Sequence, residues 1–294
     1  MPERPRKIIE ILQYLMTDLK GYKAHISGVF TRASTTYDQV GPPFFSYFGK
    51  RLVEFGALPI GAKALDIACG RGAVLFAASD AVTESGEVIG IDISEGMIDQ
   101  TRQEIRRRQI ANTEVLVMDA GNLEFTGSKF DYVLCGLSLF FFPDLKGALS
   151  ESYRVLRPGG FIIASTFKKP KKNERMREWK DLYKSFKDRV KDVPKIKPTD
   201  LNTGRKIKRK MLETGFINVE VKSIGKTFYY QDLDEWWHTA RSHGYRAYLE
   251  RIPSEYLPEF KARALEIVRK KVTEQGIPSP WNLFFTKAQK PIVR

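Results

Sequence analysis

A glycine-rich turn and an acid at the end of the next apolar run are the groups in this chain best suited to bind a ligand. Residues 64–72 read ALDIACGRG, and residues 89–93 read IGIDI. Gly70 and Gly72 permit positive φ and let the backbone run close to a ligand. Asp92 can accept hydrogen bonds from both hydroxyls of a ribose. The pair predicts a pocket for an adenosine-containing cofactor at the carboxyl ends of parallel strands.

Two cofactors suit such a pocket, and the turn distinguishes between them. A dinucleotide site needs a third glycine three residues after the second, where this chain has Leu75. Asp66 lies in the same segment, and its carboxylate is unfavourable beside a pyrophosphate but favourable beside a cation. S-adenosylmethionine (SAM) carries a sulfonium and an ammonium group. The turn therefore favours SAM, and an NAD-dependent oxidoreductase is the remote alternative.

Three later motifs follow in order along the chain. Met97 lies just beyond the second apolar run, Asp119 and Ala120 end the third, and residues 156–160 (LRPGG) precede the fifth. With the glycine turn, these motifs resemble those of class I SAM-dependent methyltransferases. The resemblance is closest to the branch that methylates small molecules, including quinone and sterol precursors, and it covers residues 61–167. It implies SAM as the cofactor and methyl transfer as the activity.

The resemblance also implies which residues bind the cofactor. Asp119 would accept from the adenine amino group, and Tyr37 would touch the methionine end. Ala68 replaces the family's first glycine, at little cost if its φ is negative, and Arg71 points either to solvent or to the mouth of the site. Met97 is placed to cover a purine face. The expected cofactor-binding set is Tyr37, Asp66, Ala68, Gly70, Gly72, Asp92, Ile93, Met97, Asp119, Ala120 and Cys135.

Short apolar runs alternate with amphipathic stretches, which predicts an α/β fold with a parallel sheet covered on both faces. Ser94 and Asp144 are expected to cap helices, and Pro158 to end one. The resemblance implies a Rossmann-like, seven-stranded, mostly parallel sheet with an antiparallel last strand. Expected strands are 63–68, 87–92, 113–118, 130–136, 160–167, 216–230 and 281–286, and the main helices are 41–55, 72–80, 94–108, 144–156 and 206–213.

The chain is expected to divide into an N-terminal helical cap, residues 1–55, and a methyltransferase domain, residues 56–294. A basic helical segment, residues 168–210, and lid helices, residues 232–275, would be inserted in that domain. The lid begins with aromatic residues, and with residues 140–142 (FFF) they predict a cavity for a large apolar or aromatic acceptor.

Two lid histidines, His238 and His243, are candidate general bases, because histidine titrates near neutral pH. Each also has a structural interpretation as an ordinary packing residue. Which of the two interpretations holds depends on where the side chains lie relative to the acceptor.

Most of the excess positive charge lies in the basic segment. The chain has a net charge of +14, and residues 168–210 hold 18 Lys and Arg against 6 Asp and Glu. Such a segment forms a solvated surface, or it attracts RNA or another anionic partner. Trp179, Leu182 and Phe186 recur at helical spacing and are expected to pack on the core. After the fourth strand the chain reads CGLSL, not the Asn-Pro-Pro-Tyr type of segment that grips a flipped base, so a DNA substrate is not expected.

Cysteine usage and hydropathy indicate a cytoplasmic protein. Cys69 and Cys135 form neither a disulfide framework nor a metal-ligand spacing. No apolar run is long enough to span a membrane, and the N-terminus lacks the apolar stretch of a signal peptide. The predicted function is methyl transfer from SAM to a small, largely hydrophobic or aromatic acceptor. The alternatives are an RNA-directed methyltransferase that uses residues 168–210 and a non-catalytic partner protein with the same fold; the oligomeric state stays open.

Overall fold

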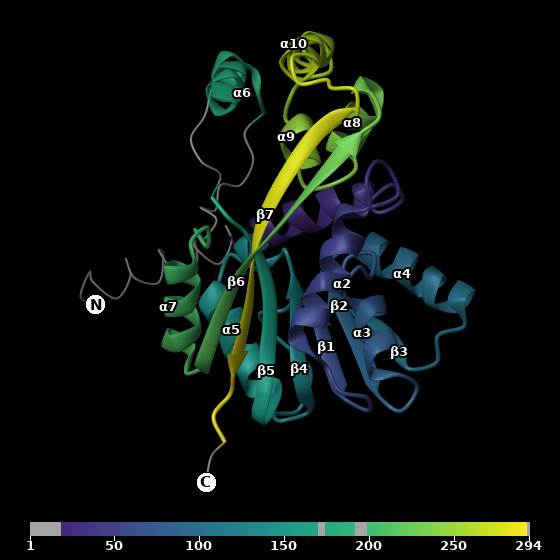
Figure 1. The fold of residues 1–294 in the computed structure, drawn as a ribbon, viewed down its shortest axis with the longest axis vertical. Coiled ribbons are helices and arrows are strands. Elements are labelled where there is room, and N and C mark those ends of the chain that lie inside the picture. The colour runs from purple at the N-terminus through teal and green to yellow at the C-terminus, as the bar shows by residue number, and fades with distance from the viewer. Residues whose placement is uncertain (1–18, 170–173, 192–198, 293–294) are drawn as a thin grey trace, which may run out of the picture.

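The computed structural model describes residues 19–169, 174–191 and 199–292. A seven-stranded sheet with the order β3-β2-β1-β4-β5-β7-β6 forms its centre (Figure 1). Strands β1 to β5 are parallel, and β7 is antiparallel to both β5 and β6. The predicted fold, including the antiparallel last strand, is confirmed. The strands are β1 (Lys63–Ile67), β2 (Glu87–Asp92), β3 (Thr113–Val117), β4 (Phe130–Gly136), β5 (Leu156–Phe167), β6 (Ile217–Tyr230) and β7 (Ile277–Gln289).

Helices cover both faces of the sheet, because its central strands are apolar on both sides. One face packs against α2 (Phe44–Gly56), α3 (Leu75–Val82) and α4 (Glu95–Arg108). The other face packs against α5 (Leu145–Val155) and α7 (Gly204–Thr214). This arrangement leaves the carboxyl ends of β1 to β5 as the edge at which a ligand can approach.

Helix starts agree with the predicted caps, whereas one helix ends earlier than expected. Ser94 Oγ accepts from the Met97 amide at 3.2 Å, and Asp144 Oδ1 accepts from the Gly147 amide at 2.9 Å. Helix α5 ends at Val155, one residue before the expected end at 156. A proline disfavours helical conformation in the residue before it, so the chain is already extended when it reaches the proline, which lies in β5.

Strand β7 has 13 residues and extends well beyond the predicted 281–286. Its first part, which contains Pro278 and Pro280, lies outside the expected range. Both prolines lie where β7 pairs with β6 alone, since pairing with β5 begins at Leu283. There the missing proline N–H groups face the unpaired side of the strand, where prolines are tolerated.

A helical lid lies beyond the carboxyl edge of the sheet (Figure 1). The lid is defined here as α6 (Glu174–Ser185), α8 (Leu233–Arg241), α9 (Arg246–Leu249) and α10 (Leu257–Arg269). It has its own apolar core, in which Leu182 and Phe186 of the basic segment pack against Trp237 and Phe260. The expected apolar face of the basic segment is therefore present, but it packs on the lid and not on the sheet. In the described part of the chain, no helix is long and apolar enough to cross a membrane.

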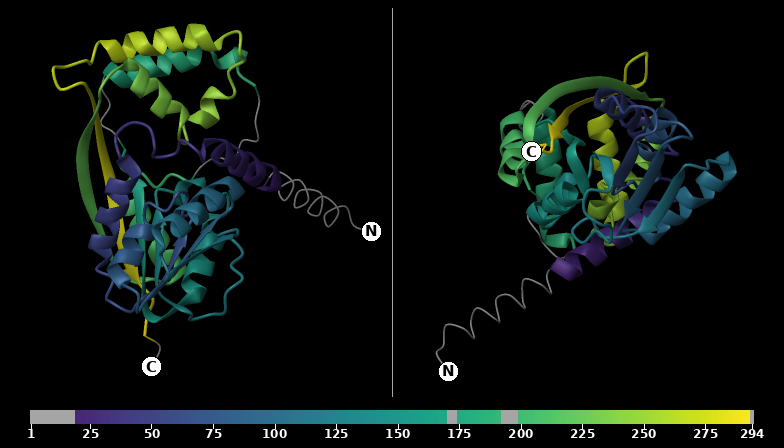
Figure 2. Two further views of the ribbon diagram at one scale, coloured as in Figure 1. Left: turned by 90° about the vertical axis from the view of Figure 1, so that its right-hand side faces the viewer. Right: turned by 90° about the horizontal axis from the view of Figure 1, so that it is seen from below.

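The lid joins the sheet through closely paired backbone. Strands β6 and β7 run together into it as a long curved ribbon, with Tyr230 paired to Ile277 at its end (Figure 2). After β5, the Lys169 amide donates to the Asn202 carbonyl at 3.0 Å. A helix of residues 19–33, the N-terminal helix, lies between lid and sheet (Figure 2).

Candidate active site

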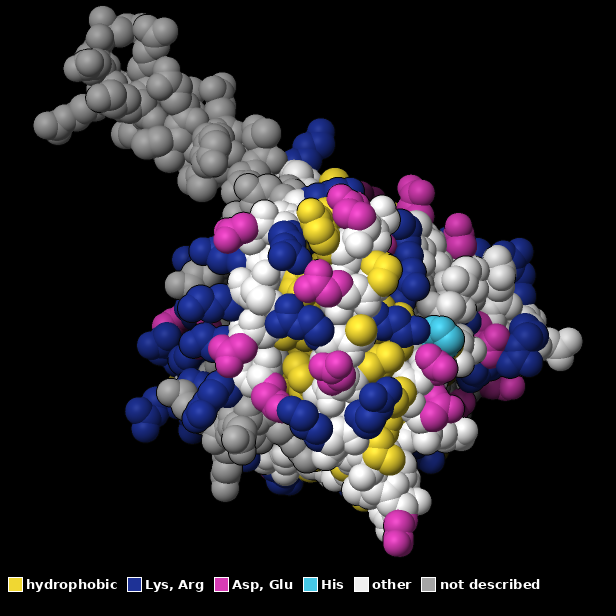
Figure 3. Space-filling view, turned by 90° about the horizontal axis from the view of Figure 1, so that it is seen from above, with side chains coloured by type: hydrophobic (Ala, Val, Ile, Leu, Met, Phe, Trp, Pro, Cys, Tyr) yellow, Lys and Arg dark blue, Asp and Glu magenta, His cyan; other side chains and the backbone are white. Residues whose placement is uncertain are grey.

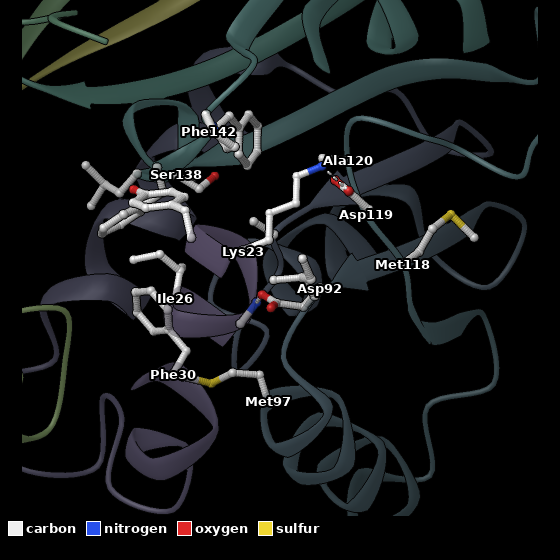
Figure 4. A pocket seen from close by; sticks show the side chains of 18 of the residues that line it. Lys23, Ile26, Phe30, Asp92, Met97, Met118, Asp119, Ala120, Ser138 and Phe142 are labelled. Carbon is white, nitrogen blue, oxygen red and sulfur yellow. Dashed lines mark hydrogen bonds and ion pairs between the residues drawn. The ribbon is translucent and has the colours of Figure 1, made fainter. Parts of the chain in front are cut away.

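The N-terminal helix closes a cavity over the carboxyl ends of β1, β2, β3 and β4 (Figure 4). This strand-end cavity encloses about 790 Å³, counting the open space at its mouth. Tyr22, Lys23, Ile26 and Phe30 form the helix side of the cavity. Of the expected cofactor-binding set, the residues that line it are Tyr37, Ala68, Gly70, Asp92, Ile93, Met97, Asp119 and Ala120.

Asp92 is buried at the end of β2 with both carboxylate oxygens held in place. Its Oδ2 accepts from the Gly70 amide and its Oδ1 from the Ser94 amide, each at 2.9 Å. Burial raises the pKa of Asp92, although these backbone hydrogen bonds favour its ionised form. Each oxygen retains a lone pair, so the carboxylate can still accept from two ligand hydroxyls.

Glycine suits position 70 for two reasons. Its φ is +53°, and a Cβ built on it would meet no atom of the described chain within 4 Å. That open space is the cavity itself, so the turn presents bare backbone to a ligand. At Gly72, φ is +86° and a Cβ would lie only 2.4 Å from the Phe76 ring, so this glycine is required by packing.

Asp66 lies on β1 at a second, adjoining cavity, the glycine-turn cavity, which Gly70, Arg71 and Gly72 also line. Its side chain is 1% exposed, and neither oxygen has a hydrogen-bond partner among the described residues. Burial, reinforced by the charge of Asp92, raises its pKa well above the usual carboxyl value. A buried carboxylate without a partner is costly, so this position favours a cationic ligand group.

Ala68, which lines both cavities, differs from the expectation for its backbone. Its φ is +54°, in the left-handed region, and not negative as an inexpensive replacement of glycine requires. The turn needs a left-handed backbone at this position, where the family usually has glycine. Because alanine carries a Cβ, Ala68 adopts this conformation at a cost of about 1–2 kcal/mol.

Of the two expected positions for Arg71, the structure has the second, since Arg71 lines the glycine-turn cavity. Its Nη1 donates to the Ser34 carbonyl at 2.7 Å and to the Thr35 carbonyl at 3.3 Å. The glycine turn therefore holds the loop that follows the N-terminal helix. Tyr37, on that loop, lines both cavities and stacks on Phe45 of α2, with ring centroids 4.5 Å apart.

Asp119 has a partner that the sequence did not reveal. Lys23 of the N-terminal helix reaches it, with Nζ 2.5 Å from Oδ2 (Figure 4). Its other oxygen accepts from the Gly121 amide at 2.8 Å. A ligand amino group at Asp119 must therefore compete with a lysine that lies 96 positions away in the chain. No local motif links the two residues.

Cys135 does not line either cavity. It belongs to β4, where its side chain faces α5 in the buried core, and its Sγ lies 2.8 Å from Ser138 Oγ. Because alternate side chains of a strand point to opposite faces, the position at the strand end does not suffice to reach the ligand. Ser138, which sequence reasoning missed, lines the strand-end cavity instead.

A third cavity, the aromatic cavity, lies between α2, the lid and the ends of β5, β6 and β7. Its rings are not the expected ones. Trp237 is buried in the lid core, Trp236 stacks on Trp179, and Phe141 and Phe142 line the strand-end cavity. The aromatic cavity is instead lined by Phe44, Phe45, Phe167, Phe228, Tyr230 and Trp281.

The two candidate bases occupy different environments. His238 is exposed on α8 and lines none of these three cavities, so its position gives it no access to a ligand proton. His243 lines the aromatic cavity, and burial lowers its pKa to about 4. Its Nδ1 accepts from the Tyr245 amide at 3.4 Å. Among the described residues, no three His, Cys, Asp or Glu side chains are grouped closely enough to hold a metal ion.

The geometry fits SAM on observations of this chain alone. Asp92 can hold the ribose hydroxyls, the space beside Gly70 admits the ligand next to bare backbone, and the unpaired Asp66 suits its cationic end. Met97 lies under the cavity, buried and fixed through its amide to Ser94.

Comparisons with known proteins agree with this fit. Residues 60–223, more than half of the chain, match a family described as a methyltransferase domain. Aklanonic acid methyltransferase DauC of Streptomyces sp. (strain C5) is 42% identical over 141 residues, which are 48% of this chain and 64% of that protein, so less than two thirds of its length is spanned. Demethylmenaquinone methyltransferase of Staphylococcus aureus (strain JH9) is 31% identical over 227 residues, 71% of this chain and 92% of that protein.

The fold is shared with solved structures at lower identity. The YcgJ protein from Bacillus subtilis has a TM-score of 0.57 at 17% identity, covering 83% of this chain and 99% of that chain. The family match and the demethylmenaquinone methyltransferase relative show the family of the whole domain. The chain belongs to the class I SAM-dependent methyltransferases, with SAM as its cofactor.

Proposed function

We propose that this protein transfers a methyl group from SAM to a small, largely hydrophobic molecule. The observation that carries the proposal is the contact between its cavities. The glycine-turn cavity shares Tyr37 with the strand-end cavity, and Phe45 and Asp38 with the aromatic cavity. A donor and an apolar acceptor would therefore meet at the stacked rings of Tyr37 and Phe45.

When bound, SAM supplies an electrophilic methyl group on its sulfonium. The chain's own residues bind and orient the reactants. Asp92 and Asp66 fix the two ends of the donor site, and the aromatic side chains exclude water from the acceptor. Holding two reactants in line in this way can lower the barrier by about 7–11 kcal/mol.

Proton removal from the acceptor has little support in the site. His243 is neutral at pH 7, and its Nδ1 lone pair is engaged with the Tyr245 amide. A neutral imidazole in that state carries its proton on Nε2 and donates there. We therefore infer that the acceptor atom is already nucleophilic when it binds, as the nitrogen of a neutral amine is. Turnover at saturating acceptor, measured with radiolabelled SAM, should then persist in both His238→Ala and His243→Ala.

The names of two relatives agree with a small-molecule acceptor. Aklanonic acid and demethylmenaquinone methyltransferases are 42% and 31% identical to this chain over the aligned regions. Because less than two thirds of the length of the first is spanned, its substrate is a guide to size and polarity and not an assignment.

The basic segment has a structural use that competes with an RNA-directed function. The apolar face of α6 packs in the lid core, and Lys206, Lys210 and Arg189 form ion pairs with Asp200, Glu213 and Glu259. Seen from above, Lys and Arg alternate with Asp and Glu over the lid and are denser toward its left edge (Figure 3). RNA binding that falls steeply with salt, together with methyl transfer to RNA, would favour the alternative.

Calorimetric titration with S-adenosylhomocysteine, and with NAD in parallel, tests the donor half of the proposal. Binding of S-adenosylhomocysteine alone is expected. Methyl transfer from radiolabelled SAM to a panel of phenols, quinones and amines then tests the acceptor half. Cofactor binding without transfer to any member of the panel or to RNA would favour the non-catalytic alternative.

A further inference from the structure

We infer that the aromatic cavity is the acceptor site and that it takes an uncharged, planar aromatic molecule; this inference rests on the proposed function. Six aromatic rings from four elements line the cavity: Phe44 and Phe45 of α2, Phe167 of β5, Phe228 and Tyr230 of β6, and Trp281 of β7. Several lie against one another, with Phe44 and Trp281 centroids 5.0 Å apart and Phe167 and Trp281 centroids 5.4 Å apart. Aromatic side chains in such edge-on and tilted contacts also pack favourably against a further aromatic ring.

The cavity lies one aromatic layer from the donor site. Phe45 lines it and also the glycine-turn cavity, and the Tyr37 ring stacked on Phe45 lines the strand-end cavity. The Tyr37–Phe45 pair therefore separates a ring held in the aromatic cavity from the donor site, and methyl transfer requires that pair to move aside.

The charges around the cavity favour an uncharged ligand. None of the described residues that line it is a lysine or an arginine. The acidic residue that lines it, Asp38, is bonded to the backbone. Its carboxylate accepts from the Phe45 amide at 3.1 Å and from the Ser46 amide at 2.9 Å, in the first turn of α2. An anionic ring would lose its hydration there without gaining a counter-ion.

His243 is a polar group that can orient the ligand. His243 has its Nδ1 bonded to the Tyr245 amide, which leaves its proton on Nε2, and no described residue is bonded to Nε2. The neutral imidazole is therefore a hydrogen-bond donor to a hydroxyl or carbonyl oxygen on the ring. His243 acts as a positioning residue and not as a base.

Calorimetry on protein saturated with S-adenosylhomocysteine tests the inference with three probes of similar size: 1-naphthol, naphthalene and 1-naphthoate. We expect 1-naphthol and naphthalene to bind, and 1-naphthoate to bind at least about tenfold more weakly because its charge is uncompensated. Failure of the loaded protein to bind either uncharged ring, or equal binding of 1-naphthoate, would overturn the inference.

Two variants locate the binding site. Val40→Phe fills the aromatic cavity and is expected to weaken 1-naphthol at least about tenfold, because the ring and the new side chain need the same space. Val272→Phe makes the same change on an exposed lid position outside the three cavities and is the matched control. Equal affinities of the two variants for 1-naphthol would place the ring elsewhere, with the strand-end cavity as the next candidate.

The hydrogen bond donated by His243 is tested by His243→Phe, which keeps an aromatic ring at this position but removes the N–H donor. It should weaken 1-naphthol about three- to tenfold and leave naphthalene unchanged, as expected for the loss of one neutral hydrogen bond. This comparison also tests whether the ring binds in the aromatic cavity if Val40→Phe does not fold. Equal effects of His243→Phe on 1-naphthol and naphthalene would contradict the proposed hydrogen bond. Failure to bind S-adenosylhomocysteine at the outset would count against the proposed function instead.

Discussion

The two halves of the sheet present different chemical groups at their candidate sites. At the ends of parallel strands β1 and β2, a few buried polar groups on consecutive segments make the donor site, and Asp66, Gly70 and Asp92 lie within 27 residues of sequence. At the antiparallel half, rings from α2, β5, β6 and β7 form the aromatic cavity. The first site depends on individual hydrogen bonds and charges, and the second on shape and the exclusion of water.

This difference predicts how each half responds to substitution. Removing one polar group from the donor site removes a specific interaction, so the affinity for the cofactor should fall strongly. Removing one ring from the aromatic cavity leaves the others in place and changes acceptor preference. Four substitutions test the donor half, from the largest expected effect to the smallest.

Asp92→Ala is expected to have the largest effect. It removes the acceptor for two ribose hydroxyls and also frees the Gly70 and Ser94 amides. At about 1.5–3 kcal/mol for each hydrogen bond to a charged group, the dissociation constant for S-adenosylhomocysteine should rise about 100-fold or more, as calorimetry would measure. Asp99→Ala, at an exposed carboxylate of α4, is the control. An affinity unchanged by Asp92→Ala would remove the proposed ribose contact.

Asp66→Asn should weaken SAM about tenfold, because a charge-assisted interaction becomes a neutral one. In the free protein the pKa of Asp66 is held well above its usual value by burial and by Asp92, and a bound cation lowers that pKa again. SAM binding should therefore release protons in the wild type, measured by calorimetry in buffers of different ionisation enthalpy, but not in Asp66→Asn. Asp80→Asn, an exposed acid at the same cavity, should behave as the wild type.

The same pKa shift has a consequence for stability. A carboxyl whose pKa is raised on folding stabilises the native state below its ordinary pKa, and that contribution is lost as the pH rises through the raised value. The free energy of unfolding of the ligand-free protein should fall across this window, and less steeply in Asp66→Asn. Denaturant titrations at several pH values measure both slopes. Equal slopes would show that Asp66 is ionised in the free protein.

Lys23→Met should strengthen cofactor binding, since it removes the competitor for Asp119. A partly exposed ion pair is worth little, so the affinity for S-adenosylhomocysteine should rise about two- to fivefold. The control is Lys20→Met, an exposed position on the same helix. A weaker affinity in Lys23→Met would mean that the lysine itself contacts the ligand.

Ala68→Gly should have the smallest effect and a stabilising one. It relieves a left-handed alanine, at φ +54°, and should raise the free energy of unfolding by about 1 kcal/mol, offset in part by the greater freedom of glycine in the unfolded chain. Ala57→Gly relieves an alanine with φ +51° at the end of α2, outside the three cavities. Both variants should gain stability in urea titrations, but a change in cofactor affinity should accompany Ala68→Gly alone.

The sequence predicted the strands and the glycine turn of the parallel half well, because their signals are local. The two short runs 64–72 and 89–93 place a turn and an acid at the ends of neighbouring strands, and β2 and β4 have the expected bounds. It could not predict the partner of Asp119, because Lys23 meets that carboxylate only through the tertiary placement of the N-terminal helix. Nor could it tell that Cys135 faces α5, which depends on the exact phase of β4.

The acceptor half was predicted in kind but not in its residues. The lid helices and an aromatic cavity were expected, yet the adjacent Trp236 and Trp237 serve the packing of the lid, and residues of α2 and the β6–β7 ribbon line the cavity. Which rings converge depends on the register between β6 and β7, set by more than 40 residues of intervening chain. No short motif encodes that pairing.

Both segments that build the lid leave and rejoin the sheet at neighbouring residues: Lys169 is bonded to Asn202, and Tyr230 is paired with Ile277. Because these ends are already adjacent, segments of other lengths can join them without moving a strand, and the entropy of closing a longer loop grows slowly. The lid is thus a part that evolution or an engineer can exchange by grafting at two junctions. Chimaeras made there would change the part of the aromatic cavity that Thr239, Ser242 and His243 line, and would continue to use the same methyl donor.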